Sequence, residues 1–246
     1  MRKDAAVIAL VALGHGTSHF FQLALAPLFP LVKADLGVSY AALGFVVALF
    51  YTVSALVQPV AGFVVDRFGA RAVLIGGIGL LALGTLVQAL GGSYAMVVAG
   101  AALAGLGNSV FHPADFSILN SRVTPGRLGH AYSAHGVAGS LGYAAAPLFS
   151  GGLGALIGWQ AALLAAALVG FAVFVALLLG RSLLATELEK TSEARAASGD
   201  ASVLFSAPVV MCFLYFVVYC AGLAGLQSFS VSAMTVQYGV PTALAS

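Results

Sequence analysis

Long apolar segments alternate with short polar segments along the whole chain. No Lys, Arg, Asp or Glu occurs in residues 5–32, 36–65, 72–114, 128–180 and 201–246. One helical crossing of a bilayer takes about 20 apolar residues, so the segments 72–114 and 128–180 must each fold as a hairpin of two crossings. The pattern predicts seven membrane-spanning helices, at about 5–31, 40–65, 72–90, 94–119, 129–156, 159–180 and 208–235. The two hairpin turns are expected at Gly91-Gly92-Ser93 and around Gly158-Trp159.

The composition of the chain indicates the same class of protein. Of its 246 residues, 61% are hydrophobic and only 7% are charged. In a soluble domain about a quarter of the residues are charged, so the fold class is all-α, a polytopic membrane protein. The formal net charge of +2 is too small to suggest a nucleic-acid partner. Cys212 and Cys220 lie about 12 Å apart along one predicted helix, too far to form a disulfide.

The basic residues are distributed unevenly between the two sides of the predicted membrane. Nine of the ten lie in segments on one side, and Lys33 alone lies on the other. Because cytoplasmic loops are enriched in Lys and Arg, we expect the N-terminus to be cytoplasmic, in a cell (inner or plasma) membrane. The same side holds the one long polar stretch, within 181–206. We interpret it as a cytoplasmic linker between a six-helix bundle in 1–180 and a seventh helix in 207–246.

Four of the predicted helices carry polar or small side chains on one face. In chain order these are His15, Ser18, His19 and Gln22, then Tyr51, Ser54 and Gln58, then Asn108, His112 and Asp115, then His135, Gly139, Gly142 and Ala146. Such faces are expected to avoid lipid. The third helix has only Thr85 and Gln88 as hydrogen-bonding side chains and the sixth has none, so both are expected to face lipid. The order repeats after three helices, which indicates two three-helix units arranged as an inverted repeat.

Several titratable side chains lie within the predicted spans, namely His15, His19, His112, Asp115 and His135. A charge inside a membrane costs roughly 3 kcal/mol or more, so such residues usually line a cavity and act in transport. Their chemistry favours protons as the coupling ion, and no glycine-rich phosphate-binding loop precedes any lysine. Neutral imidazoles hydrogen-bonded between helices remain the alternative for His15 and His19. For His130, near a helix mouth, that structural role is the interpretation we adopt.

A metal site, a cofactor and an enzymatic activity are not expected. His15 and His19 have the spacing of metal ligands, and His112 and His135 would complete a set of four. Counted along the helix axes, however, His15 lies about 15 Å from the cytoplasmic end of its helix, and His135 lies about 9 Å from that end of its own. We therefore expect these ligands not to converge. The intramembrane metalloprotease motif H-E-x-x-H does not occur either.

Residues 62–71, Gly-Phe-Val-Val-Asp-Arg-Phe-Gly-Ala-Arg, close the second predicted helix and open the third. They resemble the signature G-x-x-x-D-[RK]-x-G-[RK]-[RK] of the major facilitator superfamily, which that family carries in the cytoplasmic loop between its helices 2 and 3. The resemblance implies a tight turn at the glycines and a cytoplasmic gate at the charged residues, that is, at Gly62, Gly69, Asp66, Arg67 and Arg71. Ala70 departs from the signature, which has a basic residue at this position.

Two further stretches resemble proton-driven exporters of the same superfamily. Residues 142–152 are similar to the G-x-x-x-G-P-x-x-G-G signature of their helix 5, with Ala146 and Ser150 in place of glycines. This resemblance implies that four residues shape the interface between two halves of a transporter, namely Gly139, Gly142, Pro147 and Gly151. A generic packing helix of small residues with a proline kink is the alternative. Residues 105–113 are similar to helix 4 of the fosmidomycin-resistance branch, in which a carboxylate tends to stand at the position of Ala114.

The superfamily resemblance implies twelve helices, of which this chain supplies seven. We therefore expect an N-terminal six-helix bundle plus the first helix of a second bundle, with the missing C-terminal half present in cis or in another chain. The hypothesis is proton-coupled efflux of a small organic molecule by alternating access. The side chains expected to handle substrate and protons are His15, His19, Gln22, Asn108, His112, Asp115 and His135. Proton-coupled uptake of a small organic anion is one alternative, and a non-transporting truncated or hetero-paired half-transporter is another.

Overall fold

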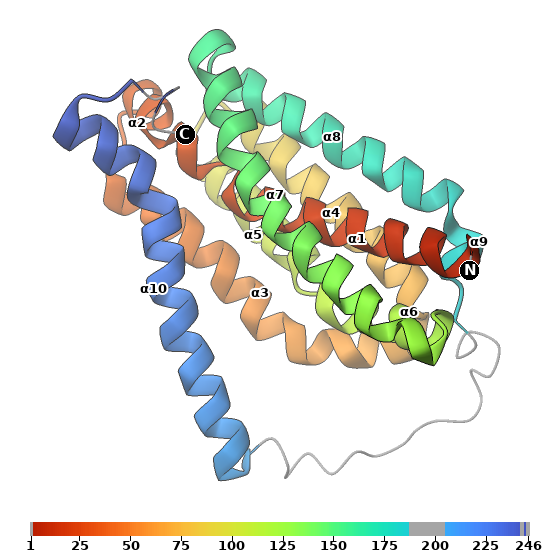
Figure 1. Ribbon diagram of the computed structural model, residues 1–246. Coiled ribbons are helices and arrows are strands. Elements are labelled where there is room, and N and C mark those ends of the chain that lie inside the picture. The colour runs from red at the N-terminus through yellow and green to blue at the C-terminus, as the bar shows by residue number, and fades with distance from the viewer. Residues whose placement is uncertain (1, 187–204, 242–243, 245–246) are drawn as a thin grey trace.

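The computed structural model describes residues 2–186, 205–241 and 244. Within this part of the chain every regular element is a helix, and two of the elements, η1 and η2, are single 3-10 turns (Figure 1). The elements are α1 Arg2–Leu23, η1 Ala26–Leu28, α2 Phe29–Leu36, α3 Tyr40–Phe68, α4 Ala70–Leu90, α5 Tyr94–Asn108, α6 Phe111–Arg122, η2 Pro125–Arg127, α7 Leu128–Ile157, α8 Trp159–Leu179, α9 Arg181–Leu184 and α10 Ala207–Tyr238.

In the part of the chain that the structure describes, seven helical segments are long and apolar enough to cross a membrane, which confirms the number predicted from the apolar pattern. Their lengths range from 21 to 35 residues. They are Arg2–Leu36, Tyr40–Phe68, Ala70–Leu90, Tyr94–Arg122, Pro125–Ile157, Trp159–Leu179 and Ala207–Tyr238. The predicted fold class, an all-helical polytopic membrane protein, is confirmed.

The first and fourth spans are interrupted, although the sequence predicted continuous helices. The first span ends as α1 and resumes through η1 into α2, and Pro27 and Pro30 lie in the first turns of η1 and α2. The fourth span breaks after Asn108, shortly before Pro113. Proline has no N–H to donate and its ring clashes with the carbonyl four residues earlier, so a new helix starts around each of these prolines.

Both predicted hairpin turns are present. A glycine pair joins α4 to α5, and Gly158, whose φ of +83° favours glycine, joins α7 to α8. Near these turns the indole Nε1 of Trp159 donates a hydrogen bond to Asp35 Oδ2 at 2.9 Å. The hydroxyl of Tyr94 donates to the carbonyl of Ala42 at 3.0 Å. These bonds tie the start of α8 to α2 and the start of α5 to α3.

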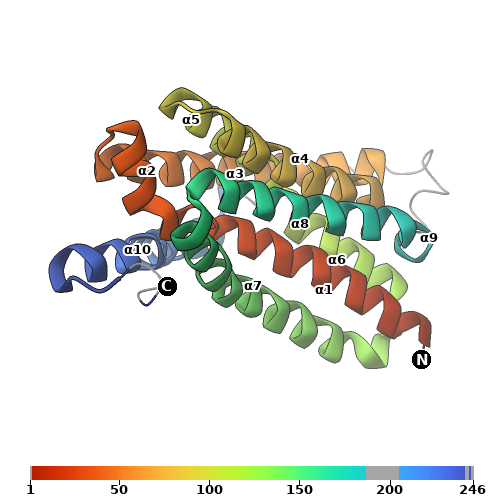
Figure 2. The same ribbon diagram turned by 90° about the horizontal axis from the view of Figure 1, so that it is seen from above.

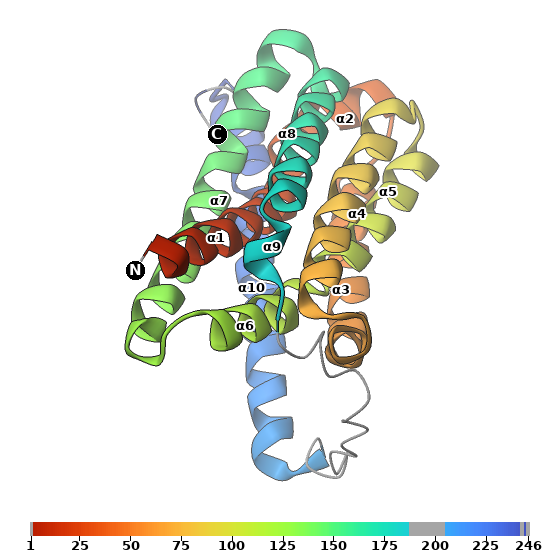
Figure 3. The ribbon, with the colours of Figure 1, turned by 90° about the vertical axis from the view of Figure 1, so that its right-hand side faces the viewer.

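The third span, α4, is mostly buried but leaves one stripe exposed, at Ala72, Gly76, Leu83 and Leu90. It packs against both α5 and α8 (Figures 2 and 3). In its most apolar stretch 61% of the residues are buried, the highest share among the seven spans, and Leu74, Ile78 and Leu81 are fully buried. The prediction that this span faces lipid is therefore kept only for the exposed stripe, because the rest of the helix is covered by its neighbours. The sixth span, α8, packs on α4 and α7 with one face and leaves side chains such as Leu168 exposed on the other.

Small residues explain why an apolar helix such as α4 can be buried. A methyl group at Gly84 would lie 2.6 Å from the carbonyl oxygen of Gly100, and one at Gly107 would lie 2.7 Å from that of Gly77. The backbones of α4 and α5 are therefore in direct contact. An apolar surface packs against another helix as readily as against lipid when small residues permit this approach.

The seventh span, α10, stands apart from the other helices (Figure 1). Its most apolar stretch contains no buried residue, and it meets the bundle at η1, near which the rings of Phe229 and Phe29 lie 5.5 Å apart. Its cysteines, Cys212 and Cys220, are free and exposed. Most of the predicted linker 181–206 lies outside the described residues.

Candidate functional site

A buried carboxylate lies among the polar side chains inside the bundle. Asp115, on α6, is 0% exposed. Its Oδ2 lies 3.0 Å from Nδ1 of His15 on α1 and 3.0 Å from Nε2 of His135 on α7, so two imidazoles can donate to one oxygen. The structure therefore brings together three predicted pathway residues that come from three helices.

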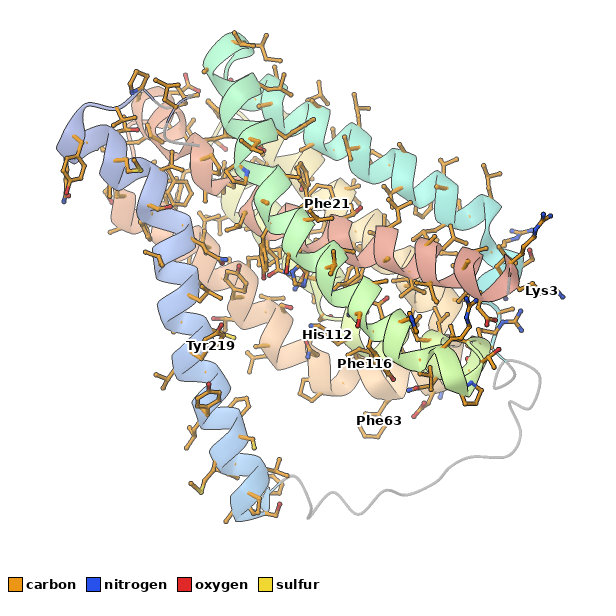
Figure 4. The ribbon with its side chains drawn as sticks, viewed as in Figure 1. Lys3, Phe21, Phe63, His112, Phe116 and Tyr219 are labelled. Carbon is orange, nitrogen blue, oxygen red and sulfur yellow. The ribbon has the colours of Figure 1, made fainter. Side chains whose placement is uncertain are left out.

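The remaining histidines of the predicted pathway lie beside this carboxylate. We call His15, His19, His112, Asp115 and His135 the histidine–aspartate cluster. The rings of His15 and His135 are stacked, with centroids 3.4 Å apart, and the rings of His19 and His112 lie 4.4 and 5.3 Å from that of His15. His112 is exposed, and Figure 4 shows it between α7 and α3. The cluster is therefore accessible from the side of His112. His130 is exposed near the start of α7, whereas the sequence analysis expected it to be hydrogen-bonded between helices.

Some buried polar atoms of the cluster have a hydrogen-bond partner in the described part of the chain, and others do not. Burying a carboxylate costs free energy unless hydrogen-bond donors stabilise it, and the two imidazoles do so at Oδ2 of Asp115. Among the described residues, however, its buried Oδ1 has no hydrogen-bond partner, and neither has the buried Nδ1 of His19. The arrangement can therefore accept a further proton or a polar group of a ligand.

The expectation that the histidines do not converge is wrong. One ring nitrogen from each of His15, His112 and His135 lies within 4.8 Å of the other two. The sequence-based estimate measured each depth from the start of its own helix, whereas α1 and α7 cross at an angle, so different depths meet at the crossing (Figure 1). This geometry could hold a metal ion, and the same three imidazoles can also accept protons.

A second set of polar side chains connects four helices next to the cluster. We call Gln22, Ser54, Asn108 and Tyr143 the amide network. The hydroxyl of Tyr143 on α7 donates to Gln22 Oε1 on α1 at 2.6 Å, and Gln22 Nε2 donates to Asn108 Oδ1 on α5 at 3.2 Å. Asn108 Nδ2 in turn donates to Ser54 Oγ on α3 at 2.9 Å. The ring of Tyr143 lies 4.4 Å from that of His19, so the network and the cluster are in contact.

The sequence identified most of these side chains but not all. Gln22 and Asn108 were predicted as pathway residues, whereas Tyr143 was missed. A signal was available, because Tyr143 lies eight residues after His135 and therefore on the same face of α7. Ser18, which shares the polar face of the first helix, donates instead to the carbonyl of His15 in its own helix at 2.8 Å.

The stripe of small residues on α7 packs against α1. A methyl group at Gly142 would overlap the carbonyl oxygen of Gly16, and one at Gly139 would lie 3.0 Å from the ring of His19. The structure places these two glycines inside the six-helix bundle, whereas the sequence predicted them between two halves. Close helix approach requires small residues in either place, so the pattern alone does not distinguish the two contacts.

Two other residues of the predicted helix 5 interface, Pro147 and Gly151, lie farther along α7. Pro147 is half-buried and Gly151 is buried. Their role between two halves stays a prediction.

The charged turn between α3 and α4 lies at one end of the bundle. Gly69 ends α3 with φ of +84°, which gives a tight turn. Asp66 and Arg67 are exposed, Gly62 is half-buried on α3, and Arg71 is the second residue of α4. The role of these residues in a gate stays a prediction.

The chain is similar in sequence to known membrane transport and resistance proteins. The family model of the Major Facilitator Superfamily matches residues 11–246. The fosmidomycin resistance protein of Escherichia coli (strain K12) is 30% identical over 149 residues, which cover 61% of this chain and 36% of that protein. The tetracenomycin C resistance and export protein of Streptomyces glaucescens is 30% identical over 148 residues, covering 60% of this chain and 27% of that protein.

A third relative is the multidrug resistance protein B homolog of Mycobacterium tuberculosis (strain ATCC 25618 / H37Rv). It is 29% identical over 127 residues, which cover 52% of this chain and 24% of that protein. The matched segments therefore span between 24% and 36% of the length of these three relatives.

Proposed function

The chain belongs to the major facilitator superfamily, a family of transporters, and we propose that it forms part of a secondary active transporter that exports a small organic molecule in exchange for protons. The names of the relatives support export, because they include resistance proteins and one protein described as an exporter. The distribution of basic residues supports a cell (inner or plasma) membrane location with the N-terminus in the cytoplasm.

The observation that carries proton coupling is the burial of Asp115 between two imidazoles. While Asp115 is ionised, the N–H groups of His15 and His135 stabilise its charge at 3.0 Å. A proton that enters past the exposed His112 neutralises the carboxylate and weakens both hydrogen bonds. The contacts that hold α1 and α7 against α6 then change. The protonated and the deprotonated cluster thus favour two different arrangements of these helices, and proton coupling requires such a two-state element.

The amide network is the proposed substrate contact. Gln22, Asn108 and Tyr143 offer neutral donors and acceptors, which bind carbonyl or hydroxyl groups without needing an opposite charge. Because the ring of Tyr143 lies against that of His19, a change in the protonation of the cluster alters the surroundings of the substrate. The same contact links proton uptake to substrate release.

The remaining parts of the proposal concern the whole transporter. We propose that a second bundle, in the same polypeptide or in another chain, completes the cavity, with α10 as its first helix. Its exposed apolar surface supports that role. Asp66, Arg67 and Arg71 are proposed to control the cytoplasmic gate, and residues 181–206 to link the two bundles.

Replacing Asp115 by Asn tests the coupling. Inverted vesicles from cells that express the chain with its second half would be given an imposed pH gradient and a panel of compounds that includes fosmidomycin and tetracenomycin C. The wild-type protein should accumulate its substrate when the gradient is present. Asp115→Asn should lose this gradient-driven stimulation, by about 5- to 150-fold if the coupling is of ordinary strength.

The matched control is His130→Asn, a change at an exposed histidine outside the cluster. It should leave accumulation and its pH dependence as in the wild type. If Asp115→Asn exported with an unchanged pH dependence, the assignment of the proton to this carboxylate would be wrong. Substrate driven in the opposite direction would support uptake of an organic anion, and no flux with a second bundle present would support a non-transporting half.

A further inference from the structure

We propose that α4 and α8 form a binding groove for one anionic phospholipid on the outer surface of the bundle. A cavity of about 570 Å³ lies between them, and its lining includes Arg71, Ile75, Gly76, Phe174, Leu178 and Arg181. The two helices lie side by side in Figure 3. The groove shares no residue with the histidine–aspartate cluster or the amide network, whereas Arg71 also belongs to the proposed cytoplasmic gate.

The apolar part of the groove is open enough for an acyl chain. Gly76 is exposed, and a methyl group there would meet no atom within 4 Å. Ile75 is nearly buried, whereas Phe174 and Leu178 are half-buried, so apolar surface faces outward along α4 and α8. Farther along α4, the ring of Phe174 would lie 3.3 Å from a methyl group at Gly79. The two helices are therefore in close contact there, beyond the open part at Gly76.

The charged part of the groove lies at the level of lipid headgroups. The α4 span begins at Ala70 and the α8 span ends at Leu179, and each has 21 residues. Arg71 is therefore at the start of α4, and Arg181, the first residue of α9, lies just beyond the end of α8. Such a helix is about 31 Å long, close to the thickness of the hydrocarbon core of a bilayer. Both guanidinium groups therefore reach the phosphate layer on the same side of the membrane.

The combination of charge and apolar surface identifies a lipid as the occupant. Guanidinium groups bind phosphate oxygens with paired hydrogen bonds, and basic pockets between membrane helices bind anionic headgroups. A soluble phosphate would bind the arginines but leave the groove between Gly76 and Leu178 unfilled. In the proposed orientation these arginines face the cytoplasmic leaflet, where anionic lipids attract basic residues.

Native mass spectrometry of the purified chain tests the headgroup contact. Adducts of a phosphatidylglycerol would be compared with those of a phosphatidylcholine that has the same acyl chains. The wild type should retain the anionic lipid preferentially. Arg181→Gln should weaken that retention about five-fold and the double change Arg71→Gln with Arg181→Gln about twenty-five-fold, as expected for two basic residues near a membrane surface. The control Arg2→Gln, at an exposed basic residue outside the groove, should retain the preference.

A second pair of measurements tests the acyl contact and the source of the phosphate. Gly76→Leu should reduce phosphatidylglycerol adducts while both arginines remain, and the melting temperature should show that the variant is folded. Glycerol phosphate, which has no acyl chain, should fail to displace the lipid. The proposal is overturned if the double arginine variant keeps the wild-type preference, if Gly76→Leu binds the lipid as the wild type does, or if glycerol phosphate displaces it.

Discussion

Single glycines on α7 differ in what surrounds them. Gly142 lies against the carbonyl of Gly16 on α1, whereas Gly136 is exposed and a methyl group there would meet no atom within 4 Å. The approach of α1 to α7 also determines the distance between His15 and His135. The size of residue 142 therefore controls both the stability of this helix pair and the geometry of the cluster.

Substituting alanine at these two positions separates packing from helix propensity. Gly142→Ala should destabilise the protein by about 1–3 kcal/mol, the usual cost of overpacking. Gly136→Ala should be neutral or stabilising by up to about 1 kcal/mol, because alanine favours helix. Thermal unfolding in detergent, followed by circular dichroism, measures both changes. Equal destabilisation by the two substitutions would show that the α1–α7 contact is not as close as described.

At the residue scale, helical spacing in the sequence predicted which side chains turn inward. It did so for His15, Gln22, Asn108 and Asp115, because neighbours on one helix face follow from the period alone. It did not predict that His15 and His135 reach the same oxygen of Asp115. That contact depends on how α1, α6 and α7 cross, which no single-helix pattern contains.

At the scale of elements, the two interrupted spans meet each other. Gln22 is the penultimate residue of α1 and Asn108 is the last residue of α5, and their side chains are hydrogen-bonded at 3.2 Å. These are the first and fourth spans, which hold corresponding positions in the predicted three-helix units. Interrupted helices at corresponding positions are a feature of transporter binding sites, so the breaks support the placement of the proposed substrate contact.

The sequence did not predict that most of α4 is buried, and the physical reason applies to any apolar helix. Lipid tails and the side chains of neighbouring helices are equally apolar, so hydropathy does not separate them. The relevant signal is the spacing of small residues, such as Gly77 and Gly84 on α4 facing Gly100 and Gly107 on α5.

Lipid exposure along α4 can be measured directly. In a background with Cys212 and Cys220 replaced by Ser, spin labels would be placed at Leu81, which is 0% exposed, and at Leu83, which is 42% exposed. Collisions with dissolved oxygen, which concentrates in lipid, should be frequent at position 83 and rare at position 81. Frequent collisions at both positions would mean that the face of α4 at Leu81 also meets lipid and that the described packing is wrong.

At the scale of the whole molecule, the six-helix bundle makes few contacts with α10. Near η1, Phe229 packs against Phe29, but most of α10 is exposed. The buried hydrophobic core is formed almost entirely by residues of the bundle. The stability of the bundle is therefore expected to depend little on the seventh helix.

A chain shortened to residues 1–186 tests that independence. Its melting temperature in detergent should differ from that of the 246-residue chain by less than about 4 °C, the shift that corresponds to roughly 1 kcal/mol in a protein of this size. Gel filtration should show a single species. A large loss of stability, or aggregation of the shortened chain only, would mean that α10 is an integral part of the fold.

The hydrogen bond between Trp159 and Asp35 makes the fluorescence of Trp159 sensitive to the contact between α8 and α2. Trp159 is the one tryptophan in the sequence, its side chain is 3% exposed, and its indole N–H is bonded across from α8 to α2. Any motion that separates these helices breaks the bond and brings water to the indole, which shifts its emission to longer wavelengths. The emission wavelength of Trp159 therefore reports the opening of this end of the bundle without any attached dye.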